Sequence, residues 1–475
     1  MTTTSTPVPT ETPASLIWYT DRSRYNVGTR RCPRSRYLGY HAGPTGYGLT
    51  ACQTALPLAT GLGVHHGAEA FAAILRDHDR LPDLTETRQI VADTVTEYIL
   101  RVEKRGYLGI LGGPTTEETI TEQSCLIGGL LWVVRLNFLP WLHQNYQVVS
   151  VEKERLHFLS CECGAPPLDA AEHMRRGCTG QALMLRNDLL ARRRNASSLA
   201  YFEFKTTGWE SDAWVEQWET DPQLAAGTVD VEALHGAEVT ETYIVALSKG
   251  RRAKDRNETD GRKRQQSPLC YGYCRPANPP LAPDDWLPAY EWINANGETK
   301  RASRAHRRRG IWELEKSDWP TYNAYRTANP DMTPVEFWVR QLPASILDRI
   351  CFTLGPMNRQ DAQLGMLLRG IAGEETRWQH ALWRLYDLQQ DGYAWSSPVF
   401  QALLDELIPC SWNCRPFGKD HQCEFVPICH HHIGWDDPIG SGHYQPRLPH
   451  HEPELHQAVA RGLLTADAAE AAEEE

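Results

Sequence analysis

A change of hydrophobic period divides the middle of the chain into helical and extended segments. From residue 61 apolar side chains recur at helical spacing, and residues 115–142 predict a buried helix or helix pair. Four later segments, most of them rich in β-branched and aromatic residues, predict strands at 146–152, 183–192, 199–206 and 242–247. A helical segment, 209–226, separates the last two strands. The order helix, three strands, helix, strand predicts a mixed α/β core.

An acid and a lysine stand two residues apart in the strand predicted at 199–206. In an extended strand Glu203 and Lys205 share one face. Asp188 lies fifteen residues before Glu203, across the polar turn 193–198, so a hairpin would bring the three together. Metal-dependent phosphodiester hydrolysis needs hard oxygen ligands and a cation that positions water and offsets phosphorane charge. The alternative is a half-exposed strand that carries a surface ion pair.

A histidine and a glutamate four residues apart mark the helix that begins at Gly61. His65 and Glu69 lie on the same helix face. An imidazole in this position can bind Mn²⁺ or a similar ion. The alternative is a histidine near a helix N-terminus with no ligand role.

Cysteines gather in the C-terminal part of the chain. Thirteen cysteines in a long chain without an export signal favour metal or cluster binding over a disulfide framework. The closest-spaced members are Cys410, Cys414, Cys423 and Cys429. With Cys32 near the N-terminus as a further candidate, four thiolates satisfy either Zn²⁺ or a 4Fe–4S cluster. We expect the histidines at 430–432 to be a polar exit from the cluster and not ligands.

A second group of potential ligands lies between the first two predicted strands. Its members are Cys161, Cys163, His173 and Cys178. They could form a second zinc site, or they could be reduced surface thiols beside an unrelated histidine.

Composition leaves the partner open. The net charge of −11 argues against a uniformly basic surface but allows local basic patches, such as residues 250–264 and 300–309. The N-terminus has no signal-peptide pattern. The most apolar stretch, 126–142, contains Arg135 and Pro140 and is shorter than the ~20 residues that span a bilayer. We therefore expect a cytoplasmic protein without a membrane segment.

The order of these motifs resembles the RecB-like branch of the PD-(D/E)XK nuclease superfamily. The similarity is greatest to phage-type members and to the CRISPR-adaptation and AddB nucleases that carry an iron–sulfur cluster. The matching motifs are Cys32-Pro33, Gly61/His65/Glu69, Glu152, Arg186-Asn187-Asp188, Glu203-Phe204-Lys205-Thr206, Gln223 and Cys423-x5-Cys429. Each motif is weak alone, but together they follow the family order over about residues 18 to 432.

The resemblance implies a restriction-endonuclease-like core, a mixed central sheet flanked by helices, with helical and basic loop insertions. It implies one elaborated domain at 16–435, with its core at about 60–250, a basic insertion at about 250–310, and helices and the cysteine cluster at about 335–432. Residues 1–15 would be a disordered tail, and 436–475 an extension with an acidic tail.

The resemblance also implies a metal-dependent DNA nuclease, an exonuclease on single strands or duplex ends in phage or prokaryotic recombination, replication or repair. His65, Asp188 and Glu203, with the Phe204 carbonyl, would hold Mg²⁺ or Mn²⁺. Lys205 would position or activate water, and Gln223 would orient Lys205 or DNA. A helicase or recombination partner would supply unwinding, since the chain has no P-loop motif. The alternative is a catalytically silent DNA-binding or assembly module of the same fold.

For the cluster, the resemblance implies a 4Fe–4S centre that ties the chain ends together, with zinc as the alternative. Its ligands would be Cys32, Cys414, Cys423 and Cys429. Related nucleases often place the first C-terminal ligand three residues before the second, but residue 420 here is Asp. Cys414 is therefore our choice for that ligand, and Cys410 is its substitute.

Overall fold

The computed structural model describes most of the chain outside its two ends and one long internal stretch. The described residues are 17–43, 46–52, 56–104, 117–161, 163, 165, 172–173, 176, 178, 180–207, 212–249, 291–293, 299–301, 327–340, 342, 344–357, 361–411, 414, 423–431, 437–449 and 451–465. The predicted tail 1–15, the acidic tail and most of the basic insertion lie outside these residues.

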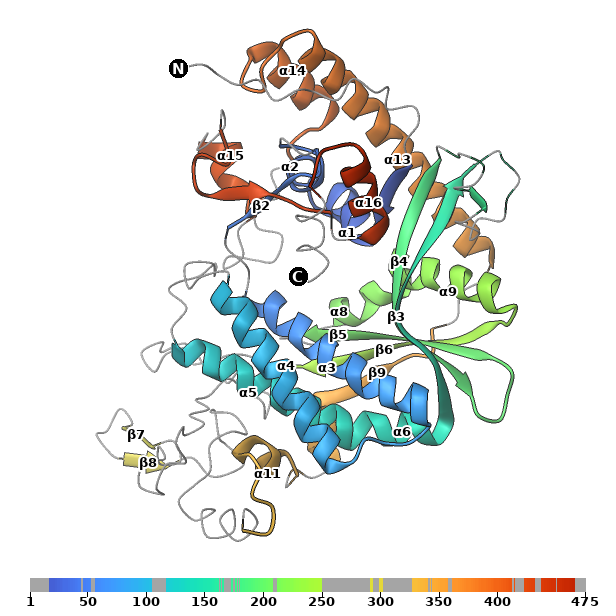
Figure 1. Ribbon diagram of the computed structural model, residues 1–475, viewed down its shortest axis with the longest axis vertical. Helices are drawn as coiled ribbons and strands as arrows, with labels where there is room; N and C mark the ends of the chain where they lie inside the picture. Colours follow the sequence, from blue (N-terminus) through green and yellow to red (C-terminus); the bar gives the residue numbers. More distant parts are fainter. Residues whose placement is uncertain are drawn as a thin grey trace.

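A six-stranded mixed sheet forms the centre of the molecule (Figure 1). Its strands are β1 (Trp18–Asp21), β3 (Tyr146–Ser160), β4 (Gln181–Arg193), β5 (Leu199–Thr207), β6 (Val239–Ser248) and β9 (Cys351–Leu354). The order is β1-β4-β5-β6-β9, and β3 pairs with β4 as its hairpin partner. The pairs β1–β4 and β5–β6 are parallel and the others are antiparallel. The predicted mixed α/β class and all four predicted strands are confirmed.

Helices cover both faces of this sheet. One face packs against α3 (Leu56–His78), α4 (Leu84–Lys104), α5 (Glu117–Val133), the π-helical turn Val134–Phe138 and α6 (Leu139–Asn145). The other face is covered by α8 (Asp212–Glu216), the 3-10 turn Gln217–Thr220 and α9 (Pro222–His235). Two further helices, α11 (Pro334–Arg340) and α12 (Ala344–Ile350), lie beside α5, and β7 (Glu291–Ile293) pairs with β8 (Thr299–Arg301) apart from the central sheet.

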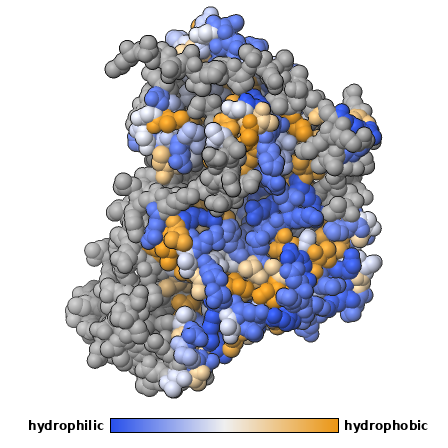
Figure 2. Space-filling model, in the orientation of Figure 1, coloured by the Kyte–Doolittle hydropathy of each residue, from blue (hydrophilic) through white to orange (hydrophobic). Residues whose placement is uncertain are grey.

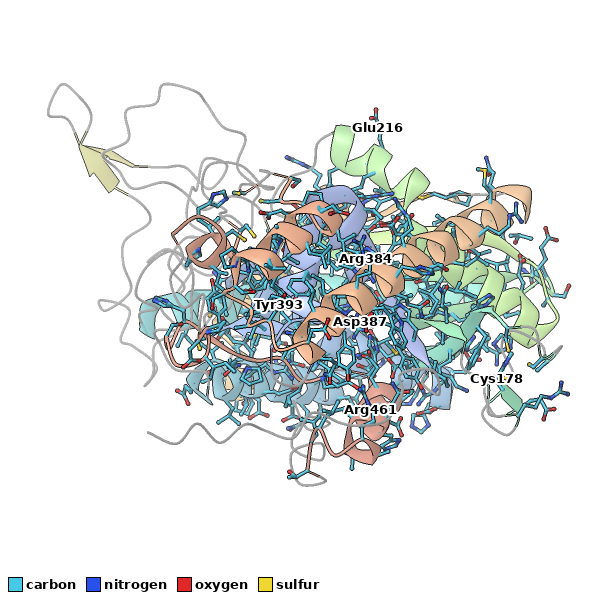
Figure 3. All side chains as sticks on the ribbon, turned by 90° about the horizontal axis from the view of Figure 1, so that it is seen from above. Cys178, Glu216, Arg384, Asp387, Tyr393 and Arg461 are labelled. Atoms are coloured by element: carbon cyan, nitrogen blue, oxygen red, sulfur yellow. The ribbon has the colours of Figure 1, made fainter. Side chains whose placement is uncertain are left out.

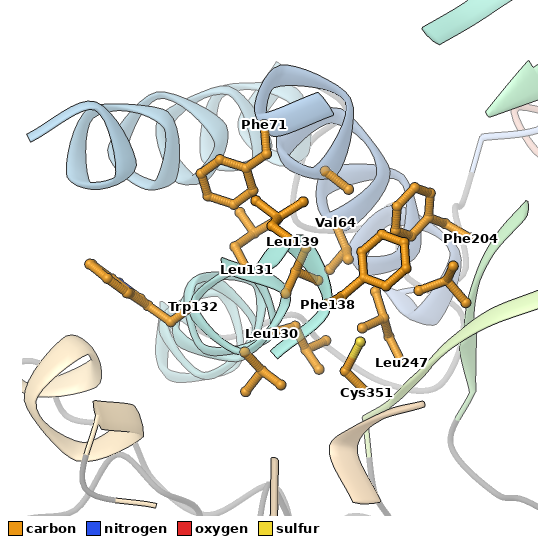
Figure 4. Close-up of a cluster of buried hydrophobic side chains, with 14 of the residues drawn as sticks. Val64, Phe71, Leu130, Leu131, Trp132, Phe138, Leu139, Phe204, Leu247 and Cys351 are labelled. Atoms are coloured by element: carbon orange, nitrogen blue, oxygen red, sulfur yellow. The ribbon is translucent and has the colours of Figure 1, made fainter. Parts of the chain in front are cut away.

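The alternation of side chains along β5 sets which residues enter the core. Phe202 and Phe204 join the cluster with Val64, Phe71, Leu130 and Phe138 (Figure 4). Tyr201, one residue earlier, faces the opposite cluster with Trp218 and Leu224. Because strand side chains alternate, Glu203 and Lys205 belong to the second face, as the sequence pattern predicts.

Among the described residues, one helical stretch, Gln123–Asn145, is long and apolar enough to cross a membrane. Its most apolar part is 72% buried inside the protein. The stretch is therefore longer than the segment 126–142 expected from the sequence, and its burial is that of a helix in a protein core.

The two ends of the chain build a second part of the molecule together, at the top of Figure 1. The N-terminal side contributes α1 (Arg22–Asn26), the π-helical turn Val27–Arg31, α2 (Pro33–Tyr40) and β2 (Leu49–Ala51). The C-terminal side contributes α13 (Asp361–Gln390), α14 (Pro398–Leu407), α15 (Val426–His431), β10 (Tyr444–Pro446) and α16 (Glu452–Ala460). Strand β10 pairs with β2, and a shared cluster joins Tyr37 and Leu38 to Trp378, Phe400 and Phe425. We call this part the terminal lobe.

Buried ion pairs reinforce the terminal lobe. The Arg36 guanidinium donates to both oxygens of Glu375, at 3.0 and 2.5 Å, and neither side chain is exposed to solvent. Trp18 Nε1 donates to the same carboxylate at 2.9 Å. Arg24 makes a second bidentate pair with Glu454 on α16, so the segment predicted as an extension packs into the lobe. In the view from above, α13, which carries Arg384 and Asp387, runs across the molecule (Figure 3).

Candidate functional site

The site lies where strand β4 separates from β5. Strand β3 occupies one edge of β4 along nearly its whole length. The other edge is shared, because β1 pairs with Gln181–Met184 and β5 pairs only from Leu189 to Arg192. Residues 185–188 therefore span a fork between two neighbours. Asp188 directly precedes Leu189, and Glu203 directly follows Phe202, the two residues at which the β4–β5 pairing ends.

Hydrogen bonds fix both of these carboxylates at the fork. Asp188 Oδ2 accepts from the backbone N–H of Phe204 at 2.6 Å. One oxygen of Glu203 accepts from the Tyr201 hydroxyl, and the other is paired with the Lys205 ammonium. Glu203 is 1% exposed and Asp188 is 7% exposed. The sequence prediction that Asp188, Glu203 and Lys205 converge is met by this geometry.

Helix α3 brings an imidazole to the same point. His65 Nδ1 lies 3.6 Å from Asp188 Oδ2, and its ring packs edge-on against Phe204. Burial, and then the positive charge of Lys205, lower the pKa of His65 to about 3. The ring is therefore neutral at physiological pH, which is the form that binds a metal.

Strand β3 adds a third carboxylate that was absent from the predicted ligand set. Ligand atoms of Glu152, His65 and Asp188 lie within 4.8 Å of one another. Glu152 is paired with Arg186 and has a φ of +44°, a left-handed conformation that costs about 1–3 kcal/mol in a non-glycine residue. The resemblance points to Glu152 as a motif residue, but only the β3–β4 register brings it beside Asp188.

The carboxylates of this site are largely shielded from solvent. Burial and the charge of Asp188 raise the pKa of Glu152 to about 8. Burial, and then Asp188, also raise the pKa of Glu203, and burial raises that of Asp188. The cluster therefore holds negative charge at a cost, which a bound cation would offset.

Cationic and aromatic side chains border the carboxylates. Arg22 donates to Asp221 at 2.8 Å, and its guanidinium lies 5.5 Å from the centre of the Trp218 ring. Lys205 Nζ lies 5.7 Å from the same ring. Sequence reasoning missed Arg22, because no local pattern links α1 to a strand that begins more than 150 residues later.

Two predicted roles remain predictions. Gln223 stands in the first turn of α9, directly after Asp221, but its side chain lies outside the described part of the chain. Phe204 contacts Asp188 through its N–H group, and the ligand role of its carbonyl is untested.

The C-terminal cysteines meet Cys32 in the terminal lobe. The Sγ atoms of Cys410 and Cys414 lie within 4.8 Å of each other and of a His430 ring nitrogen. Cys414 Sγ is 2.9 Å from His430 Nε2. The backbone N–H of Ser411 donates to Cys32 Sγ at 3.5 Å. His430, expected to lead the chain away from the cluster, is instead a potential ligand beside Cys414.

The remaining two thiols belong to the same neighbourhood. The N–H of Cys423 donates to the Cys414 carbonyl at 2.7 Å. Burial, followed by the charges of Cys410, Cys423 and Cys32, raises the pKa of Cys429 to about 12. Cys32, Cys423 and Cys429 therefore lie in the same neighbourhood, but the side chains whose ligand atoms converge and could bind a metal are Cys410, Cys414 and His430.

The group Cys161, Cys163, His173 and Cys178 also converges, with its ligand atoms within 4.8 Å of one another. A cavity of about 260 Å³ lies elsewhere, in the terminal lobe, between Trp18, Tyr40, Trp383 and Arg461. The cavity is not lined by Asp188, Glu203 or Lys205.

Hydrophilic side chains gather across the middle of the face shown in Figure 2, between the helices of the sheet core and the terminal lobe. A scan of the chain against models of protein families gives no match, and a search of curated proteins finds no significant similarity.

The function must therefore be argued from the site formed by His65, Glu152, Asp188, Glu203 and Lys205.

Proposed function

We propose that the chain is a divalent-metal-dependent DNA nuclease with a restriction-endonuclease-like core, of the RecB-like branch of the PD-(D/E)XK superfamily. One observation carries this proposal. Ligand atoms of an imidazole from α3 and carboxylates from β3 and β4 lie within 4.8 Å of one another, and the buried β5 carboxylate with its paired lysine lies beside them. Four elements separated in sequence supply this set, and general packing does not require it.

The donor set fits a hard divalent cation. Asp188, Glu152 and Glu203 offer carboxylate oxygens, the ligands of Mg²⁺ and Mn²⁺, and the neutral imidazole of His65 suits Mn²⁺. Burial, and for Glu152 and Glu203 also the charge of Asp188, raise the carboxylate pKa values, and a bound cation would offset both effects. The bound ion would polarise a phosphoryl oxygen and lower the pKa of a coordinated water.

The protein's own residues orient the reacting groups. Tyr201 and Lys205 hold the two oxygens of Glu203, and the Phe204 N–H holds Asp188, so neither carboxylate can rotate freely. The Lys205 ammonium can hold the attacking water and offset negative charge on the phosphorane. Arg22, whose guanidinium also lies near the Trp218 ring, can neutralise a neighbouring phosphate.

The substrate follows from this chemistry and from the resemblance. We propose single-stranded DNA or duplex ends as the substrate, with a helicase or recombination protein as partner. The basic stretches 250–264 and 300–309 are the candidate phosphate contacts. A catalytically silent module of the same fold is the second reading, but the intact set of Asp188, Glu203 and Lys205 disfavours it.

The test is degradation of end-labelled single-stranded DNA by the full chain with Mg²⁺, Mn²⁺ or EDTA. We expect cleavage only with a metal, and a loss of at least about 100-fold in Lys205→Ala, because the charge that faces the phosphorane is removed. Lys153→Ala removes an exposed lysine from β3 and should retain activity. Equal rates in wild type and Lys205→Ala would disprove the catalytic proposal, and circular substrates would separate endonuclease from exonuclease action.

For the cysteines of the terminal lobe we propose a 4Fe–4S cluster, with zinc as the alternative. Anaerobically purified protein should be brown, with a broad thiolate-to-iron absorption that dithionite bleaches. Cys423→Ser should lose this absorption, while Cys52→Ser, at an exposed position outside the cluster, should keep it. If the protein is colourless and its zinc content falls in Cys423→Ser, the site holds zinc and not an iron–sulfur cluster.

A further inference from the structure

The end of the β3–β4 hairpin holds a ligand group that the proposed nuclease chemistry does not use. The sulfur atoms of Cys161, Cys163 and Cys178 and a ring nitrogen of His173 lie within 4.8 Å of one another. Figure 3 places Cys178 at the edge of the molecule, away from the labelled residues of the terminal lobe. With Zn–S bonds of about 2.3 Å and Zn–N bonds of about 2.0 Å, tetrahedral ligands lie roughly 3.5–3.8 Å apart. The four side chains therefore already stand near the spacing of a tetrahedral site.

The histidine is held in place for this role. His173 is 1% exposed, and its ring stacks on Phe158 with the centroids 3.9 Å apart and the planes 12° apart. Its Nδ1 atom lies 3.3 Å from Cys163 Sγ. The His173 ring is held between the Phe158 ring and the three thiols, and one of its nitrogens lies close to all three sulfur atoms.

Backbone donors and a local turn support the thiols. The N–H of Ala165 donates to Cys163 Sγ at 3.3 Å, a bond that favours the thiolate over the thiol. Arg176 is paired with Glu172 and also donates to the Cys163 carbonyl. The N–H of Cys178 donates to the His173 carbonyl at 3.0 Å, which brings the last ligand back to the group.

We propose that Cys161, Cys163, His173 and Cys178 form a structural zinc site that closes the β3–β4 hairpin. Three thiolates and one imidazole make a closed set for zinc, with no position left for a substrate. The three cysteines are free thiols and do not form disulfides with one another. This site is independent of the proposed nuclease activity.

The site also positions a long-range strand pair. Two residues after Cys178, the Gly180 carbonyl accepts from the Trp18 N–H at 3.0 Å, and β1 then pairs with Gln181–Met184. Zinc would therefore fix the segment of β4 on which the N-terminal strand docks.

The first measurement is the metal content of the full chain and of variants, by mass spectrometry of the elements. We expect one zinc per chain that is lost in the double variant Cys161→Ser/Cys178→Ser and retained in the control Cys52→Ser. Cys423→Ser, which changes the terminal-lobe cluster, should keep this zinc. His173→Cys should also retain it, because a fourth thiolate is an equivalent ligand, whereas His173→Ala should bind it more weakly. Unchanged zinc in the double variant would overturn the proposal.

A second measurement uses only the wild-type protein, so its outcome does not depend on whether a variant folds. In native wild-type protein, Cys161, Cys163 and Cys178 should resist iodoacetamide until a zinc chelator is added, as read by peptide mass spectrometry. Exposed Cys52 should react without the chelator and is the internal control. Rapid alkylation of the three cysteines before chelation, or a disulfide among them, would overturn the proposal.

Discussion

Asp188→Asn should lower the rate of metal-dependent DNA cleavage on the order of 10³-fold, or about 4 kcal/mol of transition-state stabilisation. The substitution keeps the shape of the side chain and leaves an oxygen that can still accept from the Phe204 N–H. It removes the charge that would bind the cation between His65 and Glu152. The measurement is the single-turnover rate on labelled DNA over a range of Mn²⁺ concentrations.

The same variant separates a catalytic role from a structural one. Burial raises the pKa of Asp188, so the charged carboxylate is destabilised in the metal-free protein. Asp188→Asn should therefore not reduce the thermal stability of the metal-free protein. Mn²⁺ should raise the melting temperature of wild type but not that of Asp188→Asn. Asp391→Asn, an exposed change after α13, should behave as wild type in both assays. Cleavage by Asp188→Asn within tenfold of wild type would show that Asp188 is not a ligand.

Glu375→Gln should lower the free energy of unfolding by about 3–5 kcal/mol, the usual cost of removing one partner from a buried ion pair. The change leaves the guanidinium of Arg36, which is fully buried and lies 4.4 Å from the Trp378 ring centre, without its counter-charge. It also weakens the bond from Trp18 Nε1. The measurement is urea unfolding of the full chain, followed by tryptophan fluorescence.

Two controls locate the effect in the ion pair. Glu406→Gln changes a carboxylate that is 64% exposed and paired with Arg384, and it should cost less than about 1 kcal/mol. Arg36→Met combined with Glu375→Leu removes both charges and should recover much of the lost stability, because the desolvation penalty disappears. If Glu375→Gln costs no more than Glu406→Gln, the pair does not hold the terminal lobe together.

The sequence could predict the elements whose pattern repeats over several turns or strand residues. The helical spacing that begins at residue 61 falls within α3, and the β5 alternation places Glu203 and Lys205 together. Strands β1 and β9 were not predicted, because four residues carry too little periodicity to distinguish a strand. β1 joins the sheet only through its pairing with β4.

Only the part of the candidate site that depends on local sequence could be predicted. Asp188 and Glu203 are neighbours through a hairpin, which is local in sequence. His65 was linked to them by motif order, since nothing in α3 itself indicates which strand it faces. Glu152, Arg22 and His430 enter their sites through register and tertiary packing, which a single sequence does not specify.

The terminal lobe has a consequence for how the protein is made. Its core joins Tyr37 and Leu38 to Phe400 and Phe425, and β2 finds its partner only at Tyr444–Pro446. On a ribosome that adds about 5–20 residues each second, the segment 37–51 must wait roughly 20–80 seconds for these partners. The sheet helices and β3 to β6 emerge well before then. Nascent chains should therefore carry an assembled sheet core while Tyr37, Leu38 and Leu49 are still exposed and open to chaperones.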